Sequence, residues 1–370
     1  MNSGKIDNNG LNLAAATTAL IAGAGLCDEA LHLQLGECSL RLRSNSSPLL
    51  ARLRDYFQHV VGGASPVDLD VIAIERDAPD LDLPFVDWAR EPGKRGRKDA
   101  YLDIDGGRLV LKVRTGMLFL QSQSQRIAAG PCLQNDNQVV NFINAQYMNW
   151  LQNRGWLICH ASGLVKDGRC LGMAGFSGGG KSTLMLHMMD HDEISYLTND
   201  RLFVRQASGG PQALGIPKLP RINPGTIVHN PRLHSLIPRT RRDELLQLPL
   251  AELWEIEDKY DVQVEKVYGR GKIQPSAALT AFLVLNWQRG ASAELALEEV
   301  DLRQRRDLLG AIMKSPGPFY QYPDGSFYQD TTPFDEQSYL DALQGVSVYE
   351  ASGGIDFPGL VERCLTEVLA

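Results

Sequence analysis

The chain has 370 residues, which at about 150 residues per domain is enough for two or three domains. Hydrophobic residues make up 44% and charged residues 22% of the chain, which excludes a wholly disordered protein and a coiled-coil rod. The net charge of −7 excludes a basic footprint spread over the whole surface, so we expect no nucleic-acid partner.

Cysteine usage and hydropathy favour a cytoplasmic protein. The six cysteines form no CxxC pair, so we expect reduced thiols rather than disulfides or a zinc site. No run of about 18 or more apolar residues occurs, so we expect no membrane span. Residues 11–27 are rich in alanine and resemble an export signal, but Leu26 is too large for a cleavage site. We therefore expect a flexible or helical N-terminal arm over residues 1–30.

Residues 31–154 are expected to form an α+β N-terminal domain without a chemical motif of its own. The basic run over 94–98 is interpreted as a solvated loop, with a contact to phosphate or an acidic partner as the alternative. The predicted elements are, in chain order, a strand over 31–43, a helix over 49–61, a strand over 68–74, a hairpin over 103–113 and a helix over 137–154.

Residues 155–370 are expected to form a second domain of the α/β class. The predicted elements are a strand over 156–160, a turn over 165–169, a strand over 170–175, a glycine-rich loop, a helix over 183–189 and a strand over 194–197. The tail contains the segment 315–330, which is rich in Tyr and Phe. Together with the N-terminal half, that segment is where we expect partner recognition.

The glycine-rich loop matches the phosphate-binding (Walker A) pattern G-x-x-x-x-G-K-[ST], with an apolar strand before it and a helix after it. Glycines let backbone N–H groups converge on phosphate oxygens, Lys181 supplies a positive charge, and the Ser182 hydroxyl is placed to bind Mg²⁺. The nucleotide-binding residues predicted here are Gly175, Phe176, Ser177, Gly178, Gly179, Gly180, Lys181, Ser182 and Thr183.

Asp200 and His160 are the catalytic candidates that accompany Lys181. Asp200 ends an apolar strand eighteen residues after Ser182, where phosphoryl transfer needs a carboxylate. His160 ends the strand fifteen residues before Gly175. A hairpin between the two flanking strands would bring His160 near the phosphate loop. The histidines at 187 and 191 straddle a helix end and are interpreted as surface residues.

These motifs together resemble a known family. His160-Ala-Ser-Gly, the loop FSGGGKST and Asn199-Asp200-Arg201 are similar to the catalytic domain of HPr kinase/phosphorylase, most of all to the bacterial HPr kinase-related kinases. The resemblance covers residues 155–205 well and the rest of the C-terminal half loosely. It does not extend to the N-terminal domain.

The resemblance implies an α/β fold with a P-loop kinase core of the HPr kinase/phosphoenolpyruvate-carboxykinase-like type. It further implies ATP and Mg²⁺ as cofactors, a protein serine as acceptor, and ring-like homo-oligomers. By position, Lys181 would bind phosphate, Ser182 would bind Mg²⁺, Asp200 would accept the serine proton and His160 would assist.

The chain departs from the family's pattern in two places. Asn199 stands where the family has the first of two paired acids, which removes one carboxylate. The stretch 215–225 contains no Glu where the family has a metal-binding one, which puts the reverse phosphorylase reaction in doubt. Lys218 and Arg221 in that stretch could neutralise phosphate or grip a substrate, and otherwise belong to a proline-stiffened loop. Arg270 has the same two interpretations.

The leading hypothesis is an ATP-dependent kinase that phosphorylates a hydroxyl group, on a protein serine or on a small molecule. The alternatives are an ATPase without a phosphoryl acceptor and a nucleotide-binding regulatory module. The absence of an apolar strand ending in Asp-Glu argues against the ATPase, and the presence of Lys181 and Ser182 argues against the regulatory module.

Overall fold

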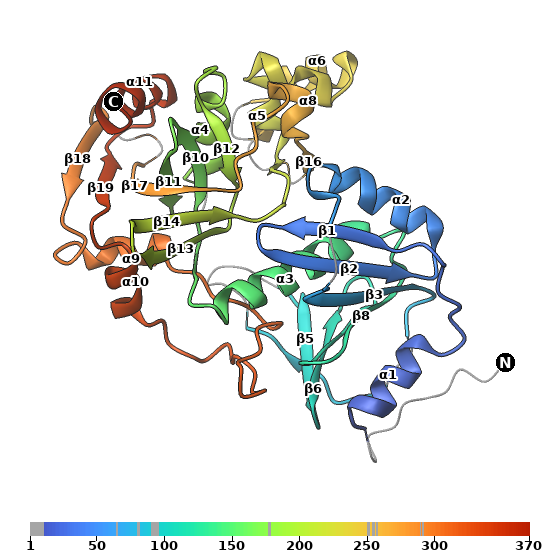
Figure 1. The fold of residues 1–370 in the computed structure, drawn as a ribbon. Helices are drawn as coiled ribbons and strands as arrows, with labels where there is room; N and C mark the ends of the chain where they lie inside the picture. Colours follow the sequence, from blue (N-terminus) through green and yellow to red (C-terminus); the bar gives the residue numbers. More distant parts are fainter. Residues whose placement is uncertain are drawn as a thin grey trace. The chain divides into compact units, whose positions relative to one another are not determined.

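The computed structural model describes residues 11–370 except 64–65, 80–81, 90–95, 177–178, 250–251, 254–255, 257, 289 and 291. The chain is a mixed α/β protein with two large sheets, one in each of two compact units (Figure 1). Unit 1 consists of Met1–Arg154 and Ser315–Pro333, and unit 2 of Gly155–Lys314 and Phe334–Ala370.

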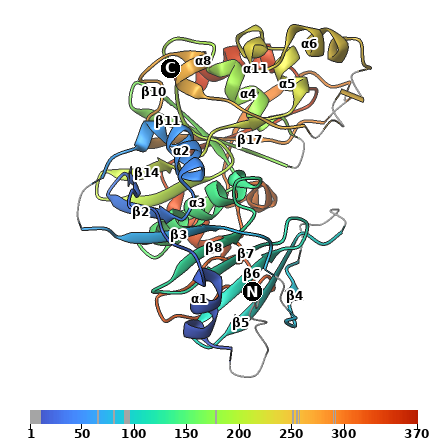
Figure 2. The same ribbon diagram turned by 90° about the vertical axis from the view of Figure 1, so that its right-hand side faces the viewer.

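Unit 1 is built on an eight-stranded mixed sheet with the order β1-β2-β3-β8-β7-β6-β5-β4 (Figure 2). Its strands are β1 (Leu31–Leu35), β2 (Cys38–Ser44), β3 (Leu69–Glu75), β4 (Val86–Asp87), β5 (Asp99–Ile104), β6 (Gly107–Lys112), β7 (Met117–Gln121) and β8 (Arg126–Gly130). Its helices are α1 (Leu13–Ile21), α2 (Ser47–Tyr56), the short η1 (Gln58–Val60) and α3 (Asp136–Gln152).

Both faces of this sheet are covered by helices. Successive side chains of a strand point to opposite faces, so neighbouring residues of β7 pack against different helices. Leu118 and Leu120 of β7 pack in one cluster with Ala16 and Leu20 of α1. Phe119, which lies between them in sequence, packs on the other face against Phe142 of α3 at 4.9 Å between ring centroids. Of the two forms expected for the arm over 1–30, the described part takes the helical one: α1 packs on the sheet with Ala16 and Leu20 buried, so this part is not flexible.

The segment Ser315–Pro333 completes the α3 face of the same sheet. Phe319 packs against Phe119 and Phe142, with ring centroids at 5.5 and 5.2 Å. The fully buried Arg108 of β6 donates to the carbonyl oxygens of Pro318 at 3.2 Å and Tyr328 at 2.9 Å. The predicted single domain over 155–370 is thus interrupted, since this segment belongs to unit 1. Much of its aromatic content is used for packing there.

Unit 2 is built on a nine-stranded sheet in which β12-β10-β11-β17-β14-β13-β9 follow one another and β19 and β18 branch from β17. Its strands are β9 (Leu157–Cys159), β10 (Ser162–Lys166), β11 (Arg169–Gly175), β12 (Ser195–Thr198), β13 (Leu202–Ala207), β14 (Gly210–Gly215), β17 (Ser276–Leu285), β18 (Ala296–Val300) and β19 (Ser347–Ser352). A separate two-stranded sheet pairs β15 (Arg221–Ile222) with β16 (Tyr260–Asp261).

Helices cover both faces of the large sheet of unit 2. The α helices are α4 (Lys181–Met188), α5 (Pro224–Val228), α6 (Arg239–Leu246), α8 (Val264–Tyr268), α9 (Leu309–Ile312), α10 (Glu336–Ala342) and α11 (Phe357–Arg363). The remaining helical turns are η2 (Pro231–Leu236), η3 (Arg306–Leu308) and η4 (Cys364–Val368). Leu171 and Met173 of β11 pack in the cluster that holds α4 and α11, and Cys170 and Ala174 face the cluster that holds α9 and α10.

Two predicted strand arrangements differ from the structure. The alternating run 31–43 is a hairpin of β1 and β2, because a turn at Gly36 with φ +59° divides it. The strand that ends before His160 does not pair with β11. Instead, β10 and β11 form the hairpin around Asp167-Gly168, while β9 pairs with β13. Among the described helices, none has both the length and the hydropathy that a membrane crossing requires.

Candidate active site

The glycine-rich loop leads from β11 into α4, and residues of unit 2 far away in sequence hold it in place. Gly180 has φ +80°, and a Cβ atom there would lie 2.7 Å from the Phe357 ring, so only glycine fits. The indole N–H of Trp287 donates to the carbonyl oxygen of Gly179 at 2.9 Å. These contacts fix the backbone just before Lys181, the first residue of α4.

Lys181, His160 and Asp200 form a contiguous polar chain. The Lys181 ammonium lies 3.4 Å from Nε2 of His160, and it also donates to the Gly175 carbonyl oxygen at 3.3 Å. The same His160 nitrogen lies 3.1 Å from the Asp200 carboxylate. The pairing of Cys159 with Leu202 across β9 and β13 brings His160 beside this carboxylate. The structure thus unites the three predicted catalytic residues, although through a different strand pair from the one expected.

Asp200 sits in an unusual backbone conformation at the end of β12. Its φ of +74° is the left-handed region that non-glycine residues seldom adopt, and such residues concentrate at functional sites. Burial raises the pKa of its carboxyl group. Arg201 at 2.6 Å, the hydrogen bond with His160 and the charge of Lys218 together outweigh burial and hold the pKa well below 3.8. Asp200 is therefore an anion at neutral pH.

Asn199 orients the Ser182 hydroxyl. The Oδ1 atom of Asn199 accepts hydrogen bonds from Ser182 and from Ser162 of β10, each at 3.0 Å. Because the Ser182 proton is directed at Asn199, the lone pairs of the Ser182 oxygen are available on its other side. Asn199 can therefore fill the orienting role of a carboxylate without contributing a charge.

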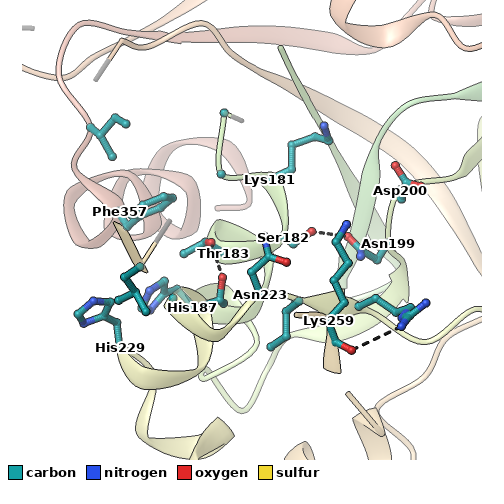
Figure 3. Close-up of a pocket in the computed structure, with 18 of the residues that line it drawn as sticks. Lys181, Ser182, Thr183, His187, Asn199, Asp200, Asn223, His229, Lys259 and Phe357 are labelled. Atoms are coloured by element: carbon teal, nitrogen blue, oxygen red, sulfur yellow. Dashed lines mark hydrogen bonds between the residues drawn. The ribbon is translucent and has the colours of Figure 1, made fainter. Parts of the chain in front are cut away.

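Lys181, Asp200, Asn199 and Ser182 border one cavity of about 970 Å³ within unit 2, large enough for a nucleotide, whereas His160 contacts two of them without lining it (Figure 3). One end is lined by charged and amide side chains, and the other by the rings of His187, His229 and Phe357 (Figure 3). The described lining residues are Gly179, Gly180, Lys181, Ser182, Thr183, His187, Asn199, Asp200, Lys218, Leu219, Arg221, Ile222, Asn223, Gly225, Thr226, His229, Leu253, Lys259, Gly290, Gly354, Ile355 and Phe357.

Not every predicted binding residue reaches this cavity. Ser177 and Gly178 lie outside the described residues. Gly175 and Phe176 are not part of the lining, and the Phe176 side chain is 42% exposed. Among the basic candidates, Lys218 and Arg221 line the cavity, whereas Arg270 is exposed and does not. In unit 1, Arg97 of the predicted basic loop pairs with Asp87 at 2.7 Å, while Lys94 lies outside the described residues.

Several lining residues carry no sequence signal. His187, predicted to be a surface residue, is partly buried and stacks on Phe357 with ring centroids 5.9 Å apart. Burial lowers its pKa, and the nearby His229 adds to that effect. Thr226 shares a 3.0 Å hydrogen bond with Thr183. Lys259 lies outside every motif, and no local pattern would have singled it out.

Comparison with known proteins adds little to this geometry. No family model matches the chain, and no curated protein matches it. A solved structure, the HPr(Ser) kinase/phosphatase from Coxiella burnetii, matches with 12% identity over 57% of this chain and 90% of that chain. The TM-score of that match is 0.29, so by itself it assigns this chain neither a family nor an activity.

Proposed function

We propose that the protein is an ATP-dependent kinase that transfers the γ-phosphoryl group of ATP to a hydroxyl group. One observation carries the proposal: a lysine that follows a glycine-rich loop and a carboxylate anion border the same cavity, and His160 contacts both. Phosphoryl transfer needs these two groups side by side, a cation for the phosphates and an anion for the attacking hydroxyl. The sequence resemblance favours a protein serine as acceptor, with a small hydroxyl compound as the alternative.

The phosphates would lie at the start of α4. The backbone N–H group of Gly180 and the positive end of the helix favour phosphate there, whereas the N–H group of Gly179 donates to the carbonyl oxygen of Phe176 at 2.9 Å. The Lys181 ammonium would balance the charge that builds on the transferred group. This ammonium contacts His160 and the Gly175 carbonyl oxygen, and phosphate would replace those partners.

Asp200 would act on the acceptor. Its carboxylate accepts a hydrogen bond from the incoming hydroxyl and so aims the oxygen at the γ-phosphorus. As the new P–O bond forms and the bond to the β–γ bridging oxygen breaks, ADP leaves with the electron pair and the hydroxyl proton passes to Asp200. His160 and Arg201 position the carboxylate through their contacts at 3.1 and 2.6 Å.

The oxygen donors of the cavity fit a hydrated Mg²⁺ ion. The Ser182 oxygen has free lone pairs because its proton goes to Asn199. Oδ1 of Asn223, another lining residue, is buried without a hydrogen-bond partner among the described residues. Neutral oxygens and water are ligands that Mg²⁺ accepts. When bound, the ion would offset phosphate charge, with Ser182 and Asn223 holding it directly or through water.

The test combines two variants with a matched control. We expect Lys181→Ala to lose ATP binding and turnover, and Asp200→Asn to bind ATP but lose transfer of label from γ-³²P-ATP to a component of source-cell lysate. Lys266→Ala removes an exposed lysine of α8 outside the cavity and should behave as wild type. Circular dichroism establishes that each variant folds.

Three results would contradict the kinase. If folded Lys181→Ala protein still turns over ATP, the assignment of the phosphate site to Lys181 is wrong. ATP binding without consumption or labelling, in the wild-type protein, supports the regulatory module instead, and consumption without labelling supports the ATPase.

A further inference from the structure

The charged end of the cavity holds more cations than a nucleotide site of this kind needs. Besides Lys181, its described lining includes Lys218, Arg221 and Lys259, whereas Asp200 is the one carboxylate among the described lining residues. The protein as a whole is acidic, with a net charge of −7. A concave site in which cations prevail concentrates anions, so this part of the cavity is suited to a negatively charged ligand.

The anions already present do not balance these cations. Asp200 is paired with Arg201 at 2.6 Å and with His160 at 3.1 Å. Arg221 lies 3.1 Å from Asp261, whose charge also acts on Lys218 but without forming an ion pair with it. Within the part of the chain that the structure describes, the ammonium groups of Lys218 and Lys259 have neither a hydrogen bond nor an ion pair. Two ammonium groups in the wall of one cavity thus have no ion-pair partner among the residues that the structure describes.

These cations form a group next to Asp200, separate from the glycine-rich loop. Lys218 interacts electrostatically with Asp200, Arg201 and Arg221, which places it among them. Arg221 of β15 donates to the backbone carbonyl oxygen of Lys259, just before β16, at 3.5 Å. In Figure 3, Lys181 lies on one side of Ser182 and Asn199, and the side chain of Lys259 extends toward them from the other side.

We propose that the acceptor of the phosphoryl group carries an anionic oxygen group of its own, a phosphate or a carboxylate, which Lys218, Arg221 and Lys259 bind while its hydroxyl group meets Asp200. This inference rests on the proposed function and names the chemical class of the acceptor. Holding like charges together in a partly buried wall costs free energy, and a bound anion offsets that cost. An acceptor anchored at its anionic end would present its hydroxyl group to the carboxylate in a fixed orientation.

The experiment measures anion binding with the nucleotide site filled. Wild-type protein saturated with AMP-PNP and Mg²⁺ is titrated with inorganic phosphate by isothermal calorimetry. We expect one phosphate to bind. We expect Lys218→Gln and Lys259→Gln each to weaken that binding about tenfold or more, the effect of losing one hydrogen bond between charged groups, and to change AMP-PNP affinity far less. Lys266→Gln is the matched control and should change neither affinity.

A second titration with acetate distinguishes the two possible anionic groups. Binding of phosphate alone indicates an acceptor that carries a phosphate. Comparable binding of acetate indicates a carboxylate, as on an acidic side chain beside a protein hydroxyl. The proposal is overturned if neither anion binds to the nucleotide-loaded protein, or if Lys218→Gln and Lys259→Gln weaken AMP-PNP instead, because the lysines would then serve the nucleotide.

Failure of the proposed function gives a different result. In that case Lys181→Ala and wild-type protein bind AMP-PNP equally well or not at all. Nucleotide-free Lys181→Ala protein still reports on the second site, since we expect it to bind one phosphate that the double variant Lys181→Ala/Lys218→Gln loses. Absence of that phosphate overturns the anion site by itself.

Discussion

Asp200 must satisfy two demands at once, a left-handed backbone and a charged side chain. Both Asp200→Ala and Asp200→Gly remove the carboxylate, but only glycine adopts φ +74° without strain. We therefore expect the free energy of unfolding of Asp200→Gly to exceed that of Asp200→Ala by about 1 kcal/mol in urea titrations. Equal stabilities would mean that the backbone relaxes once the carboxylate is gone.

Lys218 makes anion binding sensitive to pH. Burial lowers its pKa to about 8, and Arg201 and Arg221 add to this while Asp200 and Asp261 oppose it. Only the protonated lysine attracts an anion, so phosphate affinity should fall as pH rises above about 8. Lys218→Arg should keep its affinity, because arginine stays charged. Calorimetric titrations on either side of pH 8 measure this, and identical pH profiles of the two proteins would contradict it.

The same shift has a consequence for stability with the opposite sign. In the folded protein Lys218 releases its proton near pH 8, whereas in the unfolded chain it does so near 10.5. Between these values the unfolded state binds more protons, so the contribution of Lys218 to the free energy of unfolding increases with pH. Anion binding and ligand-free stability should therefore respond to alkaline pH in opposite directions.

Residues whose roles depend on local sequence order can be predicted, whereas residues brought to the site by chain folding cannot. Lys181 and Ser182 could be predicted because a strand, a glycine-rich loop and a helix are contiguous. His160 could be singled out as well, but the hairpin expected to bring it near the phosphate loop is wrong, because β9 pairs with β13 rather than with β11. Lys259 could not be predicted, since it reaches the cavity only through the pairing of β15 with β16.

At the scale of elements, the glycine-rich loop depends on Trp287, which follows β17. Trp287→Phe keeps an aromatic ring beside Phe357 but removes the N–H group that donates to Gly179 at 2.9 Å. We expect ATP affinity to fall about two- to tenfold, the usual effect of one neutral hydrogen bond. Trp156→Phe is the matched control, because Trp156 packs against Arg205 and does not line the cavity. Equal losses in both variants would argue against a specific role for Trp287.

The predicted elements are accurate where periodicity or a turn signal is strong. The helix expected over 137–154 is α3, and the hairpin expected over 103–113 is formed by β5 and β6. The run 31–43 is two short strands rather than one, and its apolar positions change phase at the turn, from 31, 33 and 35 to 38, 40 and 42. Alternation shows which face is buried, and this change of phase marks where the chain reverses.

At the scale of the whole molecule, unit 1 is assembled from two stretches of sequence. A fragment of residues 1–154 lacks Phe319 and the two carbonyl oxygens to which Arg108 donates. We expect this fragment to be less stable, by about 3 kcal/mol or more, than a version with residues 315–333 joined through a flexible linker. Urea titrations of the two proteins compare them, and equal midpoints and slopes would show that the segment contributes nothing to folding.

Because residues 315–333 come late in the sequence, unit 1 cannot be completed until most of unit 2 has been synthesised. The ribosome makes residues 155–314 before it reaches the part that covers Phe119 and Phe142, which at translation speeds takes on the order of 10 s. Through that interval the nascent chain carries an uncovered aromatic face, so we expect chaperones to engage it there. A premature stop codon shortly before residue 315 would therefore impair the folding of unit 1, which is synthesised first, as well as that of unit 2.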